Sequence, residues 1–266
     1  MKDIVLSMAQ TRSVAGDIQS NFERMKTLIK NVQRDSDMIC FPEASLTGYE
    51  TGDPGPFCIS VEDAFISEIS VLSEEYGINI IFGFMERHGA NMHITQAISD
   101  AKGSIHIYRK THLGRKEREK FVPGNEIPVF KLPSATIGIQ LCWESHFPDI
   151  STRMRRDGVE IILMPYASPR PPDHRRDIWM KHLPARAYDN GIFIGAVNAV
   201  GENGRGINFG GGIMVFDPKG NIIAEHFGRD DNVITVSLPS SARSILGPDD
   251  KMGNTDYFIY RRDDLY

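Results

Sequence analysis

Apolar and polar positions along the chain fall into two recurring patterns. Segments such as 4–9, 78–84 and 161–164 are apolar at most positions, which is typical of strands buried on both faces. Segments 22–32 and 65–76 instead repeat apolar residues every three or four positions, which predicts helices with one buried face. The first half of the chain therefore alternates strands with amphipathic helices.

The same patterns and the turn residues between them predict the remaining elements. Strands are predicted at 4–9, 38–42, 78–84, 93–99, 104–109, 129–132, 136–141, 161–164, 192–197, 211–216, 222–226 and 233–238, and further helices near 148–156 and 175–189. Ser20 is a candidate N-cap of the first helix, and Gly77 is placed to end the second. The sequences 100–103 and 217–220 are turn signals that predict hairpins.

Helices that alternate with strands, combined with hairpins, favour a layered α/β domain with mixed sheets. No stretch of the 266 residues is rich enough in Pro, Gly or Ser to separate two units, so we expect a single domain over 1–266. The tail at 240–266 has weak periodicity but carries several aromatic residues. We expect it either to cover a subunit interface or to pack on its own domain.

Composition narrows the class of protein. The formal net charge is −5, and no basic stripe runs along the chain, which argues against a nucleic acid partner. No apolar leader and no run of 18 apolar residues is present, which disfavours secretion and association with a membrane. Three cysteines without a C-x-x-C pair fit a reducing, cytoplasmic setting. The eight histidines lack metal-ligand spacing, so we predict no metal and no cofactor.

Three ionisable residues stand at or just past the ends of predicted strands. Glu43 follows the run 38–42, Lys110 follows 104–109, and Cys142 follows 136–141. Ligands of open α/β sheets bind beyond such strand ends. A carboxylate, an amine and a thiol together supply the base, cation and nucleophile of covalent acyl transfer. Taken singly, each residue is more often a core cysteine or a solvated or ion-paired strand terminus.

These residue types suggest a chemical division of roles. Lys110 is expected to lower the pKa of the Cys142 thiol and to stabilise the oxyanion of a tetrahedral intermediate. The backbone N–H of Trp143 is a candidate second oxyanion donor. Glu43 is the candidate general base, because a carboxyl group beside apolar strands tends to have a raised pKa. Water activated by the same carboxylate would then cleave the acyl-enzyme.

Several short motifs, in order along the chain, resemble those of one family. They are Phe41-Pro42-Glu43 with Gly48-Tyr49 downstream, Tyr108-Arg109-Lys110-Thr111-His112-Leu113, Phe121-x-Pro123-Gly124, Gly138-Ile139-Gln140-Leu141-Cys142-Trp143-Glu144, Pro184-Ala185-Arg186-Ala187-Tyr188-Asp189-Asn190 and Asn208-Phe209-Gly210-Gly211-Gly212. Together they resemble the nitrilase superfamily of carbon–nitrogen hydrolases. The resemblance runs from the first strand to about residue 238.

The resemblance implies a fold, a reaction and an assembly. The implied fold is a four-layer α-β-β-α sandwich with two mixed sheets, and members commonly form homodimers or larger homo-oligomers, often with C-terminal tails that cross to the partner. Glu43 matches the family's base, Lys110 its lysine and Cys142 its nucleophile. Glu117 falls where many members place a second glutamate, and Glu119 is the weaker candidate. The implied reaction is hydrolysis of a small-molecule amide, carbamoyl or nitrile C–N bond through a thioester or thioimidate.

Amide and nitrile substrates are not separated by the motifs alone. The spelling Cys142-Trp143-Glu144 resembles true nitrilases, whereas the short chain is similar to the amidase and carbamoylase branches. We favour amide or carbamoyl hydrolysis on length and keep nitrile hydrolysis as the alternative. A catalytically silent scaffold with the same fold is a third possibility, and the intact set of Glu43, Lys110 and Cys142 argues against it.

Other polar residues near the expected site each allow two interpretations. Arg170, His174, Arg175 and Arg176 could bind a substrate carboxylate, or Asp173 and Asp177 could neutralise them on the surface. Tyr49, His146 and Tyr166 are candidate pocket residues that could equally be packing. His146 could form a dyad with Cys142, but it ranks below Glu43 as a base. The glycine-rich run 201–206 lacks phosphate-loop spacing and precedes a strand, so we interpret it as a connection.

Overall fold

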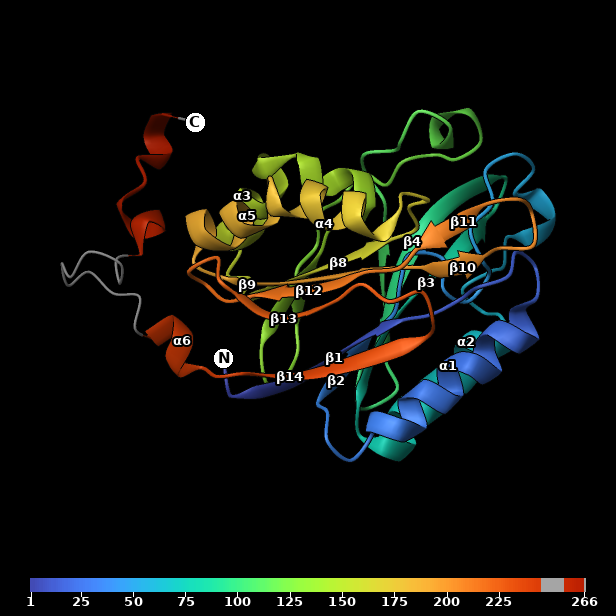
Figure 1. The fold of residues 1–266 in the computed structure, drawn as a ribbon, viewed down its shortest axis with the longest axis horizontal. Helices are drawn as coiled ribbons and strands as arrows, with labels where there is room; N and C mark the ends of the chain where they lie inside the picture. Colours follow the sequence, from blue (N-terminus) through green and yellow to red (C-terminus); the bar gives the residue numbers. More distant parts are fainter. Residues whose placement is uncertain (245–255, 266) are drawn as a thin grey trace.

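The computed structural model describes residues 1–244 and 256–265 and places two six-stranded sheets face to face (Figure 1). The first sheet has the strand order β14-β1-β2-β3-β4-β5, and its neighbours are parallel only on either side of β2. These strands are β1 (Ile4–Gln10), β2 (Met38–Cys40), β3 (Asn79–His88), β4 (Asn91–Ser99), β5 (Ile105–Arg109) and β14 (Asn232–Leu238). Helices α1 (Ile18–Val32) and α2 (Ala64–Tyr76) cover its outer face (Figure 1).

The second sheet has the order β13-β12-β9-β8-β7-β6, with β7, β8 and β9 parallel. Its strands are β6 (Phe130–Lys131), β7 (Thr136–Ile139), β8 (Ile161–Tyr166), β9 (Phe193–Asn198), β12 (Ile213–Phe216) and β13 (Ile222–His226). Helices α3 (Pro148–Arg156), α4 (Pro172–Met180) and α5 (Leu183–Asn190) cover it (Figure 1). Shorter elements are the hairpin of β10 (Val200–Glu202) and β11 (Asn208–Gly210), helix α6 (Ser241–Ser244) and the 3₁₀ turns η1 (Gly55–Phe57), η2 (Glu117–Glu119), η3 (Cys142–His146), η4 (Tyr257–Tyr260) and η5 (Asp263–Leu265).

Three apolar layers hold these four layers of secondary structure together. In β3, Ile80 and Phe82 face α1 and α2, while Ile81 faces the second sheet, so both faces of the strand are buried. In β8, Ile162 packs toward the helices and Leu163 toward the first sheet. Each such side chain contributes about 1.5–3 kcal/mol by leaving water. This double burial explains the nearly continuous apolar runs, and it confirms the predicted four-layer α-β-β-α sandwich.

The first helix begins earlier than predicted. Its N-cap is Asp17 and not Ser20, because the Asp17 carboxylate accepts a hydrogen bond from the backbone N–H of Ser20 at 3.2 Å. Asp and Ser are both favoured at the N-cap. Asp17 lies three residues before Ser20, so its side chain can accept from the free N–H of Ser20 in the first turn. Gly77 ends α2 in the left-handed conformation, with φ of 64°, as predicted.

The helix predicted at 175–189 is two helices. The break comes between α4 and α5, around His182. Pro184 lies in the first turn of α5 and has no N–H to donate to the carbonyl of Met180, so one continuous helix is disfavoured. The run 201–206 is the connection of the β10–β11 hairpin, in agreement with its interpretation as a glycine-rich link.

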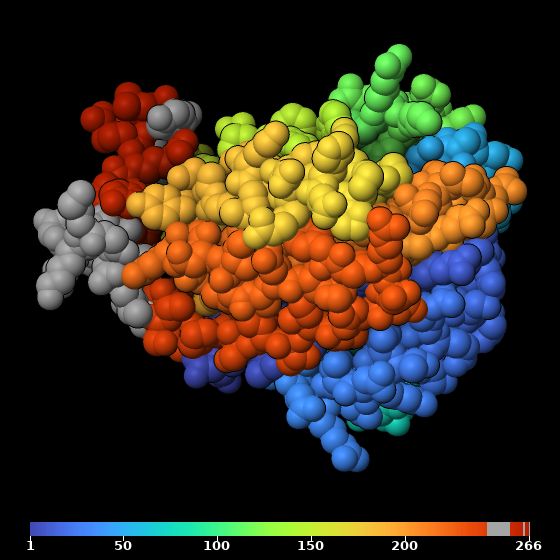
Figure 2. Space-filling model, in the orientation of Figure 1, coloured from blue at the N-terminus to red at the C-terminus, as the bar shows by residue number. Residues whose placement is uncertain are grey.

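The described part of the C-terminal tail contacts its own chain. Arg155 of α3 forms an ion pair with Asp256 at 2.7 Å and lies over the Phe258 ring. The rings of Tyr188 and Tyr257 are 5.9 Å apart. The tail residues at 256–265, drawn in red, stand out at one end of the molecule (Figure 2). Among the described residues, no helix combines the length and the apolar character needed to cross a bilayer.

Candidate active site

Two glutamates and a lysine meet beyond the strand ends of the first sheet. Lys110, which follows β5, places its Nζ 2.7 Å from Glu43 Oε1 and 2.8 Å from Glu117 Oε1. Glu43 lies in the turn after β2, and Gly83 of β3 leaves the space in which the backbone of that turn lies. The exposed fractions of Lys110, Glu43 and Glu117 are 1%, 2% and 4%. The structure thus brings together two residues predicted from strand ends and the glutamate implied by the resemblance, while Glu119 is exposed.

Both carboxylates of this cluster are held by further hydrogen bonds. Glu43 Oε2 accepts from the backbone N–H of Ala167 at 3.0 Å, which connects it to the end of β8. Glu117 accepts from the Tyr49 hydroxyl at 2.7 Å and from the backbone N–H of Gly114. Tyr49 therefore orients Glu117 and does not line the cavity described below.

The charges of the cluster shift the pKa values of its members. Burial raises the pKa of Glu43 to about 7, and the negative charge of Glu117 also raises it. The nearby ammonium of Lys110 lowers this pKa but offsets the rise only in part. Burial opposes the charged form of Lys110, but the two carboxylates outweigh it and hold the pKa of the ammonium above its ordinary value. Lys110 is therefore a permanent cation, and Glu43 can exchange a proton near neutral pH.

Cys142 opens the 3₁₀ turn η3 after β7 in a strained conformation. Its φ of 42° lies in the left-handed region, which non-glycine residues rarely adopt and which recurs at functional sites. Its thiol lies close enough to Glu43, Lys110, Glu117 and Arg175 for their charges to act on its pKa. The residue is partly exposed, but protein atoms surround the sulfur.

Lys110 acts on this thiol in the expected direction and lowers its pKa, but it does not set the net shift. Burial raises the pKa of Cys142 to about 12, and Glu43 adds to it, whereas Lys110 and Arg175 only partly offset the rise. The resting group is therefore a thiol, and its sulfur becomes strongly nucleophilic only when a base removes the proton. Glu43 is a nearby carboxylate whose pKa suits that task.

A third buried carboxylate, that of Glu144, joins the cysteine turn to the lysine strand. It is fully buried, and its oxygens accept from the backbone N–H of Leu141 at 2.7 Å and from that of Thr111 at 2.7 Å. The hydroxyls of Thr111 and Tyr108 donate to it at 2.6 and 2.7 Å. Because Leu141 precedes Cys142 and Thr111 follows Lys110, one side chain fixes the backbone beside both.

Cys142 opens onto a cavity of about 580 Å³. Trp143, His146, Tyr166 and Arg170 line it, as do Ser168, Pro169, Pro171, Arg175 and Ile178. Tyr166 is buried at the end of β8, Trp143 is 46% exposed, and Arg170 is exposed. The structure therefore places Cys142 and four other predicted site residues around this cavity.

The His146 ring packs against other rings. Its centroid lies 4.7 Å from that of His182 and 5.8 Å from that of Trp143. Burial lowers the pKa of His146, and Arg175, Arg186 and Arg170 add to this. Among the described residues, no hydrogen bond joins His146 to Cys142, which favours Glu43 as the base.

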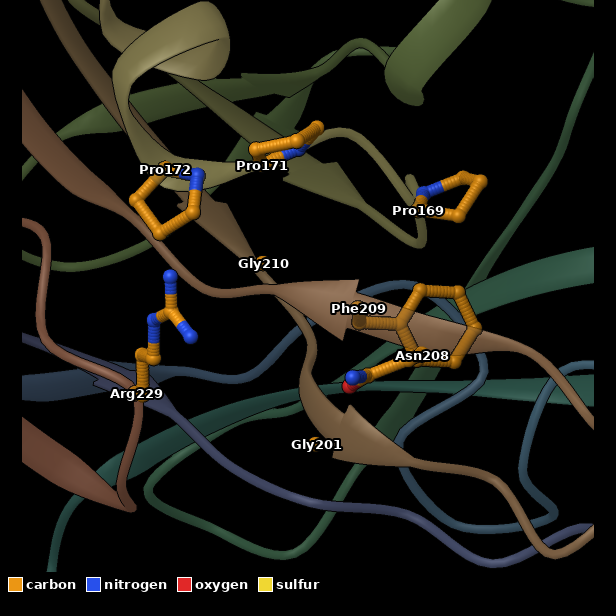
Figure 3. A pocket seen from close by; sticks show the side chains of 8 residues that line it. All are labelled: Pro169, Pro171, Pro172, Gly201, Asn208, Phe209, Gly210 and Arg229. Atoms are coloured by element: carbon orange, nitrogen blue, oxygen red, sulfur yellow. The ribbon is translucent and has the colours of Figure 1, made fainter.

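A second cavity, of about 400 Å³, shares Pro169 and Pro171 with the first. Figure 3 shows the guanidinium of Arg229 directed toward Pro172, across from the ring of Phe209. Its lining contains no carboxylate and no thiol, so it lacks the groups that the chemistry requires. Within the described ranges, no group of three His, Cys, Asp or Glu residues is arranged to hold a metal ion.

Comparison with known proteins places the chain in a family. The family model described as carbon-nitrogen hydrolase matches residues 5–245. The chain belongs to the carbon–nitrogen hydrolase family. The hydrolase is 27% identical to an (R)-stereoselective amidase from a Pseudomonas species over 88% of this chain and 84% of that protein. It is 26% identical to a probable nitrilase of Schizosaccharomyces pombe, over 84% of each chain.

Among solved structures, the hydrolase is similar to an amidase from Nesterenkonia sp. AN1. The TM-score is 0.83 and the identity 25%, and the match covers 98% of each chain. A variant of that amidase carries the acetamide moiety of fluoroacetamide covalently at its active-site cysteine. The family membership makes the present protein a hydrolase of carbon–nitrogen bonds other than peptide bonds, as predicted.

Sequence reasoning missed two features of this hydrolase's site. Glu144 was noted only as part of a motif, although a carboxylate so close to a candidate nucleophile could have signalled an orienting role. The backbone N–H of Ala167 left no signal, because a main-chain donor is set by the path of the chain. Of the four basic residues considered, only Arg170 and Arg175 line the cavity, while Arg176 pairs with Glu225 at 2.9 Å and not with either aspartate.

Proposed function

We propose that the hydrolase cleaves the amide or carbamoyl C–N bond of a small molecule, with Cys142 as nucleophile, Glu43 as general base and Lys110 as the cation of the transition state. The observation that carries this is the buried Glu43–Lys110–Glu117 cluster beside a cysteine held at positive φ. Buried charges are rare unless paired, and strained backbone recurs where chemistry occurs.

In the first half-reaction, Glu43 takes the thiol proton as the sulfur attacks the amide carbon. The high pKa of the thiol supports a proton transfer that accompanies attack. The negative oxygen of the tetrahedral intermediate is stabilised by the Lys110 ammonium and by the backbone N–H of Trp143. Glu43 then returns its proton to the leaving nitrogen, ammonia or an amine departs, and a thioester remains.

In the second half-reaction, Glu43 takes a proton from water, which attacks the thioester and releases the acid and the thiol. Glu117 has a positioning role in both halves, because it holds Lys110 and is itself held by Tyr49. Lys110 cannot act as the base while two carboxylates keep it protonated.

The test is release of ammonia and of the acid from a set of small amides and carbamoyl compounds, each matched with its nitrile. We expect amide or carbamoyl turnover that is lost in Cys142→Ala. Intact-protein mass spectrometry of Glu43→Gln should reveal a trapped acyl adduct where loading is fast enough. Turnover of nitriles without amides would overturn the choice of substrate.

Nitrile hydrolysis is the second candidate. It is favoured by the sequence motif Cys142-Trp143-Glu144 and by the relative in Schizosaccharomyces pombe that is named a probable nitrilase. The same residues would then form a thioimidate at Cys142. The intact Glu43–Lys110–Glu117 cluster argues against a catalytically silent scaffold. Alkylation of Cys142 that is as slow as that of Cys40 and Cys58 would support such a scaffold.

We further infer that the chain acts as one domain, as a cytoplasmic homodimer or larger homo-oligomer. Three free cysteines support a reducing compartment. Tyr188, Tyr257, Ile259 and Tyr260 expose 45–58% of their surface near α5 and the tail, which supports a subunit interface there. Light scattering after size exclusion would test the assembly, and a monomer at micromolar concentration would contradict it.

A further inference from the structure

The cavity beside Cys142 contains a buried guanidinium that has no acidic partner among the residues that the structure describes. Arg175 of α4 is 4% exposed and lines the cavity. It donates a hydrogen bond to the Ser168 hydroxyl and lies over the rings of Tyr166 and Trp179, 5.4 and 5.6 Å from their centroids. Its Nε has no hydrogen-bond partner, and no carboxylate of the described residues forms an ion pair with it.

A buried, unpaired arginine is unusual on physical grounds. The guanidinium keeps its charge at any physiological pH and carries five N–H donors in a planar fork. Removing such a charge from water costs several kcal/mol unless an anion or acceptors compensate, and one hydroxyl and two ring faces satisfy only part of the fork. An anion with two acceptor oxygens would satisfy the donors that remain.

The rest of the cavity has the same sign of charge. Arg170 lines it at the exposed side, and none of the lining residues is acidic. The acids of the site, Glu43 and Glu117, are instead paired with Lys110 outside this lining. A substrate that enters with its reactive carbon at Cys142 thus places its remaining atoms in a positively charged chamber.

We propose that the substrate carries a carboxylate, which Arg175 binds through its guanidinium fork while the amide or carbamoyl carbon lies at Cys142. The substrate class is then a small acid with an amide or carbamoyl group at its other end, such as the monoamide of a short dicarboxylic acid. The planar fork matches a carboxylate with two parallel hydrogen bonds. This inference rests on the proposed function of the same site.

A first test uses two alkylating reagents that differ in charge. Iodoacetate and iodoacetamide have similar size, and peptide mass spectrometry reports their reaction with Cys142, with Cys58 as an internal reference outside the cavity. We expect Cys142 to favour iodoacetate relative to Cys58. Arg175→Met should lower that preference by about 10- to 100-fold, the range for a hydrogen bond to a charged group.

Arg176→Met is the matched control. Arg176 is the next residue on α4, is 42% exposed and pairs with Glu225 outside the cavity, so its loss should leave the ratio unchanged. Arg175→Lys keeps the charge but loses the fork, and it should retain part of the preference. Equal reagent ratios at Cys142 in the wild type and in Arg175→Met would overturn the proposal. Circular dichroism and thermal unfolding identify a variant that fails to fold, and the Arg175→Lys result then decides.

A second test compares substrates. Succinamate and glutaramate should have higher kcat/KM than neutral butyramide and valeramide, and Arg175→Met should raise KM for the acids by about 10- to 100-fold more than for the neutral amides. Turnover of the neutral amides alone would overturn the carboxylate proposal and leave the proposed function intact. No ammonia from any amide, carbamoyl compound or nitrile, charged or neutral, would overturn the proposed function itself.

Discussion

Replacement of Glu144 by Gln tests whether one buried carboxylate positions both Cys142 and Lys110. The substitution keeps the shape of the side chain and removes its charge. Oε1 can still accept from Thr111. The amide NH₂ takes the place of Oε2, which lies 2.7 Å from the backbone nitrogen of Leu141, so two donors then face each other. One charge-assisted hydrogen bond is lost, and the buried N–H of Leu141 is left without an acceptor, whereas the new NH₂ group can donate to the Tyr108 hydroxyl.

The magnitude follows from these contacts. An unsatisfied buried group costs about 1–3 kcal/mol, so the free energy of unfolding should fall by about 3 kcal/mol. Because Leu141 precedes the nucleophile, a shift of about 1 Å at the turn should lower kcat about 100-fold with little change in KM. Glu144→Asp retains the charge but is one methylene shorter, and it should recover only part of the activity.

The assay combines urea unfolding with steady-state ammonia release, and Glu119→Gln is the control. Glu119 is an exposed glutamate in the same charged segment, so both quantities should stay close to those of the wild type. A Glu144→Gln variant that loses stability but keeps the wild-type kcat would refute the positioning role. Faster alkylation of Cys142 in Glu144→Gln would also refute it, because it would mean that the charge of Glu144 restrains the thiol.

Four further predictions concern the same site and its support. Cys142→Ala should lower kcat/KM at least about 10⁴-fold with little change in the urea midpoint, and residual activity near that of the wild type would contradict its role as nucleophile. The kcat/KM should increase as pH rises through about 7, because Glu43 accepts a proton only when ionised, and a flat pH profile would refute this. The raised pKa of Glu43 stabilises the fold below about pH 4.5, and this contribution is lost as pH rises through about 7. Glu43→Gln should therefore gain stability relative to the wild type between those pH values. A difference in the free energy of unfolding that does not change with pH would contradict the shift. Gly48→Ala should lower the free energy of unfolding by about 2 kcal/mol or more, since Gly48 has φ of 72° and a Cβ there would lie 2.5 Å from the backbone of Ala15; an unchanged urea midpoint would count against this strain.

The layers of this fold could be predicted from the sequence because buried faces give a periodic pattern of apolar residues. In β3 and β8, side chains on both faces enter apolar layers, so the apolar run is nearly continuous and predicts a buried strand. The N-cap of α1 was misplaced because Asp17 and Ser20 are both good caps, and only the path of the backbone decides between them. Pro184 marks the break between α4 and α5, but the helical spacing of apolar residues continues on both sides of it and favours one helix.

Other properties of the site depend on tertiary structure and left no local trace. The direction of the pKa shift of Cys142 is set by how completely protein atoms enclose the sulfur, which residue types do not reveal. Arg175 could not be distinguished from Arg170 or Arg176, because the face that each presents depends on where α4 begins. The contacts of Glu144 join segments more than 30 residues apart, so its role became visible only in the structure.

The pairing of β14 with β1 has a consequence for biosynthesis. Residues 4–10 find their antiparallel partner only at 232–238, so this edge of the first sheet stays open until residues 232–238 have left the ribosome. Such distant pairing is slow to form. Until it closes, the nascent polypeptide exposes a strand template to neighbouring chains, and chaperones should be needed until residues 232–238 have emerged.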